Sequence, residues 1–536
     1  MIISRLPALA LLAVLLAACA SVEEPAASGE RIRADVAFLA DDARAGREAG
    51  TPGYDAAADF VVRRMKEIGL EPAGASGWFQ DVPLRSAVRD MSAARLSLRS
   101  EGKATDLIHL EDFIAGRSFR APAYDISAPL VYAGYGVTAP EEGVDDYAGL
   151  DVSGKIVVVF AGAPPTLNTE KRAYYSDSDI KLENAAARGA VGFISMPTKA
   201  DADKGQWPRI VSNASSAGMT FIDADGGAPA PDLEAGAHLN VSGAGKVFAG
   251  ERSEYAALQA KEAEGAGAPK GFPLAKTARL AGASKLADSR SANVIGIIKG
   301  GDPALADEVI LLTAHLDHIG VVKSAAPGED AINNGALDNA SGVAVMLEAA
   351  RMIAQSGRQP RRTIAIVALT AEEKGLLGSE YLALRPAFGG RRIVANVNLD
   401  MPVMLYPFSD VVAFGAERTT IGPVVAKAAK GMGVALAPDP FPEENIFIRS
   451  DHYSFVKEGA PAVYLMPGFA NGGAEAFGAF LKNNYHRPSD DLSQPIDYEA
   501  LARFAELNRR IARALADAPS APAWVDGDFF GEMFAK

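Results

Sequence analysis

Histidine and carboxylate side chains recur in five short motifs in the second half of the chain, which also holds four of the six histidines. In chain order the motifs are AHLDH at 314–318, GALDNASG at 335–342, TAEEKGLLGS at 370–379, NLDM at 398–401 and YHRPSDD at 485–491. Taken singly, each is typical of a helix cap, a turn or a solvated surface. Imidazole and carboxylate ligands together suit zinc, and hydrolytic zinc sites leave one position open for water. The combination therefore predicts a hydrolytic zinc site.

A pair of zinc ions needs one carboxylate that can bridge them, and a histidine and a further carboxylate for each ion. Metal contact lowers the pKa of bound water to roughly 7, and a nearby carboxylate that does not bind metal should take the proton. The adjacent residues Glu372 and Glu373 fit this division of labour, because their side chains diverge and one can bind metal while the other faces the water. The motifs therefore predict two Zn²⁺ ions as cofactors.

Alternating strands and helices must position these motifs. Buried strands are predicted at 293–298, 308–314, 362–369, 393–399 and 462–466, with amphipathic helices at 341–355 and 498–516. This alternation is typical of an α/β fold with a mostly parallel central sheet flanked by helices. Ligand sites in such sheets lie at the carboxyl ends of the strands, which is where most of the motifs fall.

The first 285 residues differ from this pattern. An amphipathic helix is expected near 60–68, where Phe60, Val61, Met65 and Ile68 share one face and Gly69 supplies a C-cap. Residues 91–285 contain short β-like runs separated by Gly, Pro and Asp, with one helix near 181–190. We expect no metal-binding role for His109 and His238, which lie in this region.

The order of the motifs, H-x-D, D-N-A-S-G, E-E-x-G-x-x-G-S, N-x-D and Y-H-x-x-x-D, resembles metallopeptidase family 28. The family includes leucyl aminopeptidases, glutamate carboxypeptidase and glutaminyl cyclases. Carried over by position, the resemblance implies that His315 and Asp400 bind one zinc ion and that Glu373 and His486 bind the other. It also implies that Asp338 bridges both ions and that Glu372 is the general base.

The same resemblance implies further roles. Asp317 would orient the His315 imidazole through a hydrogen bond, and Tyr485 would stabilise the tetrahedral oxyanion. The Asp338–Asn339 peptide would be cis. The SDHYSF segment at 450–455 matches a family motif near the site, and we expect its residues to support the site without binding metal. His318 is expected to be structural or to contact a ligand.

The resemblance covers most of the mature chain and predicts its domains. The fold is expected to be the phosphorylase/hydrolase-like zinc peptidase fold with a smaller β-rich inserted domain that looks like a protease-associated (PA) domain. The expected boundaries are a signal peptide at 1–18, a flexible tether at 19–30, the zinc peptidase domain at 31–90 and 286–520, the PA domain at 91–285 and a C-terminal tail at 521–536.

Several functions are compatible with these residues. The leading hypothesis is an aminopeptidase that removes N-terminal residues from peptide substrates. A carboxypeptidase or dipeptidase of the same family, or a non-catalytic envelope binding protein, are the alternatives. Glu443, Glu444 and Arg449 lie in one segment that could read either substrate terminus. Amidohydrolase-type dizinc peptidases carry a large insert between their fourth and fifth ligands, whereas Asp400 and His486 are only 86 positions apart.

The ends and the composition limit the partners and the location. Arg5, the apolar run at 6–18 and the sequence LAAC resemble a bacterial lipoprotein signal, so Cys19 is expected to be lipidated and to anchor the protein to a membrane of the cell envelope. Cys19 is the only cysteine, which excludes an intramolecular disulfide and a Cys-based zinc site. The net charge of −14 and the lack of a Lys/Arg-rich run argue against nucleic acid as a partner.

Overall fold

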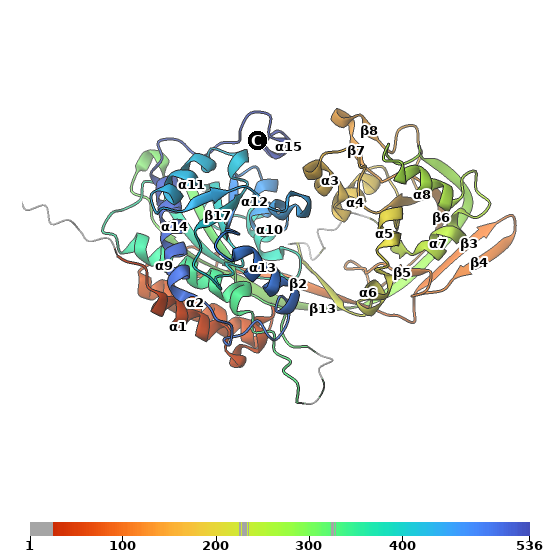
Figure 1. Cartoon of the computed structure of the whole chain (residues 1–536). Coiled ribbons are helices and arrows are strands. Elements are labelled where there is room, and N and C mark those ends of the chain that lie inside the picture. The colour runs from red at the N-terminus through yellow and green to blue at the C-terminus, as the bar shows by residue number, and fades with distance from the viewer. Residues whose placement is uncertain are drawn as a thin grey trace, which may run out of the picture.

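The computed structural model describes residues 25–223, 227, 233, 235–322, 326 and 328–535. The chain forms two lobes that lie side by side (Figure 1). We call the larger one, formed by residues 25–90 and 286–535, the main lobe, and the smaller one, formed by residues 91–285, the inserted lobe. The expected signal peptide and the expected lipidation site, Cys19, lie outside the described residues.

A mixed sheet forms the centre of the main lobe. Its middle strand, β14 (Glu308–His315), pairs in parallel with β15 (Thr363–Leu369) on one side and β16 (Arg392–Leu399) on the other. β16 pairs in parallel with β19 (Ala462–Pro467), and β19 pairs antiparallel with β17 (Asp410–Phe414), next to β18 (Ala435–Ala437). On the other side of β14, β15 pairs antiparallel with β13 (Phe272–Ile298). The short β1 (Glu71–Pro72) also pairs antiparallel with β13. The predicted mostly parallel α/β sheet is confirmed.

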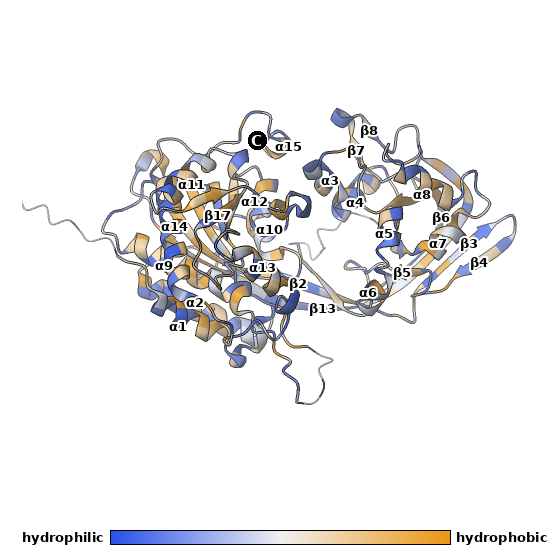
Figure 2. Cartoon of the chain, viewed as in Figure 1, coloured by the Kyte–Doolittle hydropathy of each residue, from blue (hydrophilic) through white to orange (hydrophobic). Residues whose placement is uncertain are grey.

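Helices cover both faces of this sheet because its strands are apolar on both sides. β14 and β15 are buried along nearly their whole length, and the centre of the main lobe is coloured as hydrophobic in Figure 2. On one face lie the helices α1 (Gly29–Leu39), α2 (Pro52–Ile68), α9 (Ser341–Ala354), α11 (Ile421–Lys430) and α14 (Tyr498–Asp517). Leu382 of α10 (Leu377–Leu384) and Phe455 of α12 (His452–Lys457) pack on the other face. The helix α13 (Gly473–Asn483) precedes the last motif.

The amino-terminal helices begin and end at recognisable capping residues. α2 ends at Gly69, whose φ of 90° is the left-handed conformation expected for a C-cap. The tether expected to reach residue 30 ends earlier, because α1 begins at Gly29. The Ser28 side chain caps that helix by accepting a hydrogen bond from the Arg31 amide, and Arg31 pairs with buried Glu348 at 2.8 Å.

The inserted lobe has its own sheet, built around four parallel strands, β6, β9, β10 and β12. β9 (Ile156–Phe160) lies between β6 (Ala123–Tyr132) and β10 (Gly192–Met196), and β10 continues to β12 (Ala235–Leu239) and β5 (Phe113–Ala115). On the other side β6 pairs with β13, which also pairs with β3 (Arg95–Ser100) and through it with β4 (Lys103–Leu107). The surrounding elements are α3 (Thr169–Ser176), α4 (Ser178–Ala186), α5 (Lys199–Asp203), α6 (Trp207–Ser212), α7 (Val241–Phe248), α8 (Tyr255–Ala263) and the ribbon β7 (Thr138–Ala139) with β8 (Val144–Asp145).

Two long strands join the lobes. β13 pairs with β6 over 272–283 in the inserted lobe and with β15 over 294–298 in the main lobe. Between these regions it forms a ribbon with β2 (Phe79–Arg89), which pairs in turn with β11 (Ala217–Phe221). Figure 1 shows β2 and β13 running from one lobe to the other along the lower side. The expected boundaries at 90 and 285 fall at the end of β2 and within β13.

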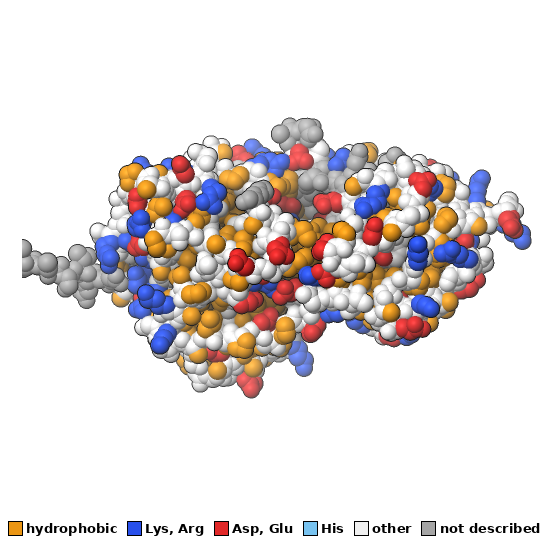
Figure 3. All heavy atoms as spheres, turned by 90° about the horizontal axis from the view of Figure 1, so that it is seen from above, with side chains coloured by type: hydrophobic (Ala, Val, Ile, Leu, Met, Phe, Trp, Pro, Cys, Tyr) orange, Lys and Arg blue, Asp and Glu red, His pale blue; other side chains and the backbone are white. Residues whose placement is uncertain are grey.

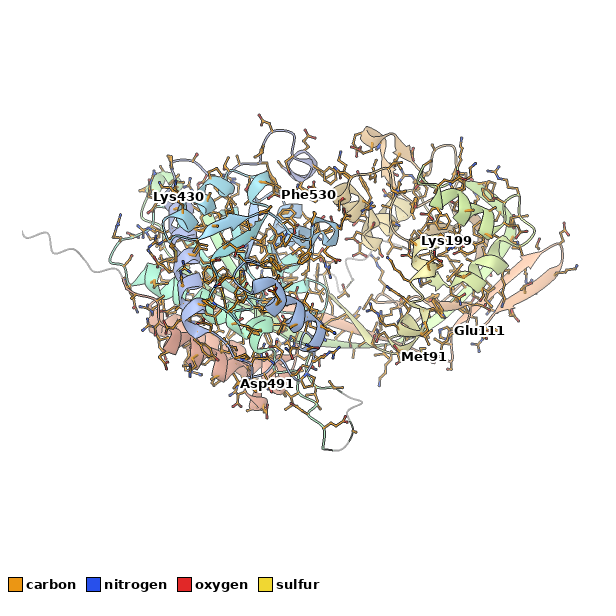
Figure 4. All side chains as sticks on the ribbon, viewed as in Figure 1. Met91, Glu111, Lys199, Lys430, Asp491 and Phe530 are labelled. Carbon is orange, nitrogen blue, oxygen red and sulfur yellow. The ribbon has the colours of Figure 1, made fainter. Side chains whose placement is uncertain are left out.

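The segment expected as a C-terminal tail forms a second connection. It contains α15 (Phe529–Phe534), whose Phe530 packs on Phe447 and Tyr453 of the main lobe. Phe529 packs on Tyr174 of the inserted lobe, and Figure 4 shows Phe530 where the two lobes approach each other. Among the described residues, no helix is both long enough and apolar enough to cross a membrane.

Candidate active site

The carboxyl ends of three neighbouring parallel strands carry the first candidate residues. His315 is the last residue of β14, Asp400 directly follows β16, and Glu372 and Glu373 follow β15 within four residues. Asp338 enters from a π-helical turn, Ala336–Ala340, at the start of α9. The pairing of β14 with both β15 and β16 therefore brings residues that are up to 85 positions apart into one site.

The two oxygens of Asp338 face different histidines. Its Oδ1 lies 3.3 Å from His315 Nε2, and its Oδ2 lies 3.3 Å from His486 Nε2. His315 Nε2 is also 3.0 Å from Asp400 Oδ1, and His486 Nε2 is 3.1 Å from Glu373 Oε2. The five residues thus divide into two groups, each with a histidine and a private carboxylate, that share Asp338.

These contacts set the protonation of the cluster. Burial opposes the ionisation of Asp338, but its hydrogen bonds with His315 and His486 hold its pKa well below the usual range. Burial also disfavours charge on His486, yet its bonds to Asp338 and Glu373 raise its pKa to about 10. The carboxylate of Asp338, which the two groups share, is therefore ionised and able to bind a cation.

His318 lies beside the second group and contacts one of its members. Its Nδ1 is 2.7 Å from Glu373 Oε1, the oxygen that points away from His486, and 3.9 Å from Asp338 Oδ2. His318, Asp338 and Glu373 place three potential ligand atoms within 4.8 Å of one another. The expectation that His318 would be structural or would contact a ligand agrees with its bond to Glu373. That bond leaves Glu373 Oε2 facing His486.

The backbone around Asp338 is held by two polar side chains. The peptide between Asp338 and Asn339 is cis, as the family resemblance implies. Asp490 accepts hydrogen bonds from the amides of Leu337 and Asp338, at 2.9 and 3.0 Å. Asn339 accepts one from the Met401 amide and donates one to the Leu399 carbonyl. These bonds fix the Asp338 carboxylate relative to both β16 and the last motif.

The predicted role of Asp317 needs correction. We expected Asp317 to orient the His315 imidazole through a hydrogen bond, and His315 Nδ1 does face Asp317 at 3.2 Å, but at its main-chain oxygen. The Asp317 carboxylate accepts hydrogen bonds from the amides of Glu372 and Glu373, at 3.1 and 3.3 Å. The peptide following β14 turns so that its carbonyl oxygen faces the ring, which frees the carboxylate for the neighbouring loop. Asp317 therefore positions the two glutamates as well as the histidine.

Glu372 lies within the site without contacting either histidine at hydrogen-bond distance. Burial raises its pKa well above the usual range, and the charges of Asp400 and Asp451 add to this effect against the opposing His315. A carboxyl group with this environment binds a proton readily near neutral pH, which is the property required of a proton carrier.

Tyr485 stacks on the ring of His486, with ring centres 3.8 Å apart. Burial raises its pKa above the usual value, so the phenol keeps its proton and can donate a hydrogen bond. A second tyrosine, Tyr464 of β19, donates to the main-chain oxygen of Asp400 at 3.0 Å. Tyr464 escaped the sequence analysis because it sits inside a buried apolar strand.

Ser450 and Arg47 also support the site. Ser450 donates to Asp400 Oδ2 at 2.6 Å and accepts a hydrogen bond from Asn398 at 2.8 Å, so the SDHYSF segment holds one carboxylate in place. The guanidinium of Arg47 is fully buried and binds the carbonyl oxygens of Leu39, Leu316, Asn334 and Gly335. Nothing in the sequence around Arg47 predicts this role.

The donor set fits metal cations. Asp317, Asp338 and Asp400 are buried. The buried guanidinium of Arg47 donates its hydrogen bonds to carbonyl oxygens and not to these carboxylates. Buried carboxylates without a compensating cation are unfavourable. His315, Asp338 and Asp400 also place three potential ligand atoms within 4.8 Å of one another. Imidazole and carboxylate ligands of this kind, without cysteine, suit zinc.

The segment 443–449, which could contact a terminus of the substrate, has charged side chains that form ion pairs with neighbouring residues. Glu443 pairs with Arg172 of the inserted lobe at 3.1 Å, and Arg449 pairs with Glu444 at 3.3 Å. Figure 3, the view from above, shows acidic side chains gathered near the middle of the molecule where the lobes meet. The charges of Glu443, Glu444 and Arg449 are therefore paired and do not by themselves select either terminus of a peptide.

Two family matches correspond to the two lobes. Residues 293–512 match peptidase family M28, and residues 126–229 match the PA domain. The first match contains every residue of the candidate site discussed above except Arg47, and the second lies within the inserted lobe.

Individual relatives agree with these matches. A probable zinc metalloprotease of Leptosphaeria maculans is 26% identical over 271 residues, which are 44% of this chain and 59% of that relative. Carboxypeptidase Q of Mus musculus is 34% identical over 107 residues, 20% of each protein. The chain thus spans only part of the length of the curated relatives it matches. The solved aminopeptidase from Aneurinibacillus sp. strain AM-1 has the same fold, with a TM-score of 0.51, 22% identity and coverage of 94% of this chain and 96% of that one.

Proposed function

We propose that this chain, which belongs to peptidase family M28 and carries an inserted PA domain, is an aminopeptidase that uses two zinc ions. The observation that carries the proposal is the geometry of Asp338, whose two oxygens each face one histidine and one private carboxylate. Two metal ions that share one bridging carboxylate require this arrangement.

In this proposal His315 and Asp400 hold one ion, His486 and Glu373 hold the other, and Asp338 binds both. His318 keeps the remaining oxygen of Glu373 occupied, and Ser450 does the same for Asp400 Oδ2. Such outer contacts orient metal ligands and raise the affinity for the metal. The relatives named as zinc metalloproteases support zinc as the metal.

When bound, the zinc ions would lower the pKa of water and polarise the scissile carbonyl. Glu372 takes the proton of the attacking water at its carboxylate and delivers it to the nitrogen of the leaving amine. Its raised pKa suits both steps, because the protonated form is stable enough to exist between them. The phenol of Tyr485 donates a hydrogen bond to the oxyanion that develops on the carbonyl.

The acidic surroundings favour the amino-terminal end of a peptide as the part bound next to the metals. A terminal ammonium is attracted by the carboxylates, whereas a terminal carboxylate is repelled. Arg449, an exposed arginine of the segment 441–449, is paired with Glu444, which weakens the case for a carboxypeptidase. The solved aminopeptidase with the same fold supports the same reading.

Peptide digestion tests the proposal. Purified protein from residue 25 onwards would be incubated with peptides that carry free or acetylated amino termini, with and without a chelator, and the products read by mass spectrometry. We expect stepwise loss of amino-terminal residues from the free peptides alone, abolished by the chelator. Carboxyl-terminal shortening of both sets would assign a carboxypeptidase, and no cleavage by folded, zinc-loaded protein would favour a binding protein.

For the location of the protein, we propose that Cys19 is lipidated and holds the enzyme on the periplasmic face of the outer or inner membrane, with a secreted form as the alternative. The lipoprotein-like sequence LAAC at 16–19 supports this proposal. Mass spectrometry of the membrane-extracted protein should find acyl chains on an amino-terminal Cys19. Substitution Cys19→Ser should release the protein from the membrane fraction, and a soluble, unmodified wild-type protein would contradict the proposal.

A further inference from the structure

A large cavity lies in the inserted lobe, outside the candidate active site. Its volume is about 1200 Å³, and residues of β2, β5, β6, β10, β12, α4 and α6 line it. Ser176, Ser178 and Asp179, which also line it, lie at the junction of α3 and α4, and Lys457 of the main lobe acts on the charge of Asp179. The cavity therefore extends to the side of the inserted lobe that faces the main lobe.

Two arginines of this cavity have only neutral partners. Arg89, at the end of β2, donates to the main-chain oxygens of Ala115 and Ala214, at 2.7 and 2.9 Å. Arg117 donates to the main-chain and side-chain oxygens of Ser216, at 3.0 and 3.1 Å. Its Nε is buried and has no hydrogen-bond partner. In the part of the chain that the structure describes, no carboxylate forms an ion pair with either arginine.

The carboxylates of the lining have other partners or positions. Asp125 pairs with Arg279 at 2.5 Å, and Asp179 lies at the start of α4, where it forms no ion pair with either arginine. Burial and the neighbouring Arg117 lower the pKa of Arg89 to about 10, and burial lowers the pKa of Arg117. Two guanidinium groups with a partly buried, uncompensated charge bind an anion more strongly than an exposed pair does.

The backbone is shaped to admit these side chains. A Cβ atom on Gly218 of β11 would lie 2.8 Å from Arg117 Cδ and 3.1 Å from its Nε, so the absence of a side chain at Gly218 gives this arginine room. The hydrogen bonds of Arg89 and Arg117 to main-chain oxygens hold the two guanidinium groups in place, which reduces the entropy lost when a ligand binds.

The chemistry of the cavity favours the carboxylate of a peptide. Guanidinium groups match the planar, two-oxygen geometry of a carboxylate. Ile114, Phe119 and Phe193 supply apolar wall for side chains next to that carboxylate. The protein as a whole carries a net charge of −14, so this cationic pocket attracts an anion that most of the molecule repels.

The distance between the cavity and the candidate active site follows from the strand register. Arg89 lies opposite Ser284 on β13, and Gln80 lies opposite Asn293 on the same strand. Asn293 accepts a hydrogen bond from the amide of Thr370, two residues before Glu372. Nine residues of β-strand span about 30 Å. An extended peptide of about nine residues covers the same distance.

We propose that Arg89 and Arg117 form a binding site for the carboxyl-terminal carboxylate of peptide substrates whose amino terminus lies at the metal site. This inference rests on the proposed aminopeptidase function and adds a preference for peptide length. Because nine residues of the β2–β13 ribbon separate Arg89 from Gln80, whose partner Asn293 contacts the loop that carries Glu372 and Glu373, the arginines cannot hold the carboxylate next to a bond being cleaved at the metal site. The site therefore anchors the far end of the substrate.

Binding of a blocked peptide tests the site independently of catalysis. The probe is a nonapeptide with a fluorescent label on its acylated amino terminus, which an aminopeptidase cannot cleave, prepared with a free or an amidated carboxyl terminus. We expect the free acid to bind at least about tenfold more tightly than the amide by fluorescence anisotropy. Arg117→Gln and Arg89→Gln should each remove this difference, while Arg117→Lys, which keeps the charge but loses the planar fork, should reduce it.

Arg99→Gln is the matched control, because Arg99 is exposed on β3 of the same lobe and does not line the cavity. It should leave the binding unchanged, and melting curves of every variant check folding. Equal binding of acid and amide by the wild-type protein would overturn the proposal. A third outcome would also overturn the proposal: neither peptide binds, while calorimetry shows tight binding of inorganic phosphate. The cavity would then be a site for small anions.

Kinetics separate this inference from the proposed function. With unblocked nonapeptides, Arg117→Gln should raise KM for the free acid about tenfold and leave kcat unchanged. Cleavage of an amino-acid p-nitroanilide, too short to reach the cavity, should not change. If no substrate is cleaved at all, the proposed function fails, yet the anisotropy experiment still decides whether the carboxylate site exists. A KM effect of equal size on the p-nitroanilide would contradict the proposed position of the site.

Discussion

The carboxylates of the candidate active site and the cationic side chains that line the cavity differ in sign and in partners. In the candidate active site, Asp338 and Asp400 face imidazole nitrogens at 3.0–3.3 Å. In the cavity, Arg89, Arg117 and Lys181 face carbonyl and hydroxyl oxygens. The first arrangement leaves room for cations between the partners, and the second leaves cations in need of an anion. Buried charge that the fold itself does not neutralise therefore marks a ligand site in each lobe, and the sign of the charge indicates the ligand.

The largest expected effect concerns Glu372, which we assign to proton transfer in place of metal binding. Glu372→Gln should lower kcat by about 10²–10⁴-fold because the general base is lost. The zinc content should not change. Steady-state kinetics and metal analysis of the same sample check both statements. Glu30→Gln, an exposed glutamate of α1, is the control and should keep full activity. Loss of zinc in Glu372→Gln would move Glu372 to the ligand set.

Metal removal should affect the lobes unequally. A chelator should lower the melting temperature of the main lobe by about 5–10 °C, because the buried carboxylates lose their cations and the binding free energy no longer stabilises the folded state. The inserted lobe has no predicted metal ligands and should retain its hydrogen-exchange protection. Equal loss of protection in both lobes would show that the metal also stabilises the PA domain and would weaken the comparison.

The connection between the lobes depends on Arg418. Its guanidinium pairs with Glu170 of the inserted lobe and, at 2.9 Å, with Asp528, and it lies over the rings of Phe447 and Phe530. Arg418→Gln should reduce the free energy of unfolding by about 2–4 kcal/mol, because two partly buried carboxylates lose their partner. Urea denaturation measures this change. Arg172→Gln, which breaks the exposed pair with Glu443, should change it by less than about 0.5 kcal/mol. Similar losses in the two variants would contradict the assigned role of burial.

A smaller effect concerns Lys181, whose ammonium donates to the carbonyl oxygens of Phe160 and Gly162. Burial lowers its pKa to about 8 from the ordinary value of 10.5. A lowered lysine pKa means that the contribution to stability is fully present above pH 10.5 and is lost as the pH falls through 8.

The melting temperature of the wild-type protein should therefore fall as the pH is lowered from 10.5 to 8. In Lys181→Met this fall should be smaller by about 2–4 °C. Lys204→Met, an exposed lysine of the same lobe, should match the wild-type protein across this range. Parallel curves for wild-type protein and Lys181→Met would show that Lys181 titrates normally.

Most of the main-lobe fold could be predicted from the sequence. The runs at 308–314 and 362–369 are continuous apolar segments that end at a motif, and they form β14 and β15. The length of β13 could not be predicted, because residues 284–292 are polar, alternate poorly and lie in a ribbon exposed to water. The tether was expected to reach residue 30, but α1 begins at Gly29, where the Ser28 amide also donates to Glu348 of α9, a contact between distant parts of the sequence.

The candidate site also has features that could be predicted from the sequence and features that could not. The predicted ligands His315, Glu373 and Asp400 lie together because they follow neighbouring parallel strands, and turns bring Asp338 and His486 to the same place. The contacts around them depend on where backbone oxygens and amides point, so the role of Arg47 and the bonds of the Asp317 carboxylate to the Glu372 and Glu373 amides escaped prediction. Arg89 and Arg117 belong to no motif, and their significance is visible only from the partners that they lack.

The number of zinc ions bound to each chain tests the central claim most directly. Protein stripped with a chelator would be titrated with zinc, with metal content and peptide cleavage measured at each step. The account predicts two equivalents in the wild-type protein, one in His486→Ala and full activity only at the second equivalent. A single equivalent that gives full activity would contradict the shared carboxylate of Asp338, as would two equivalents retained in Asp338→Ala.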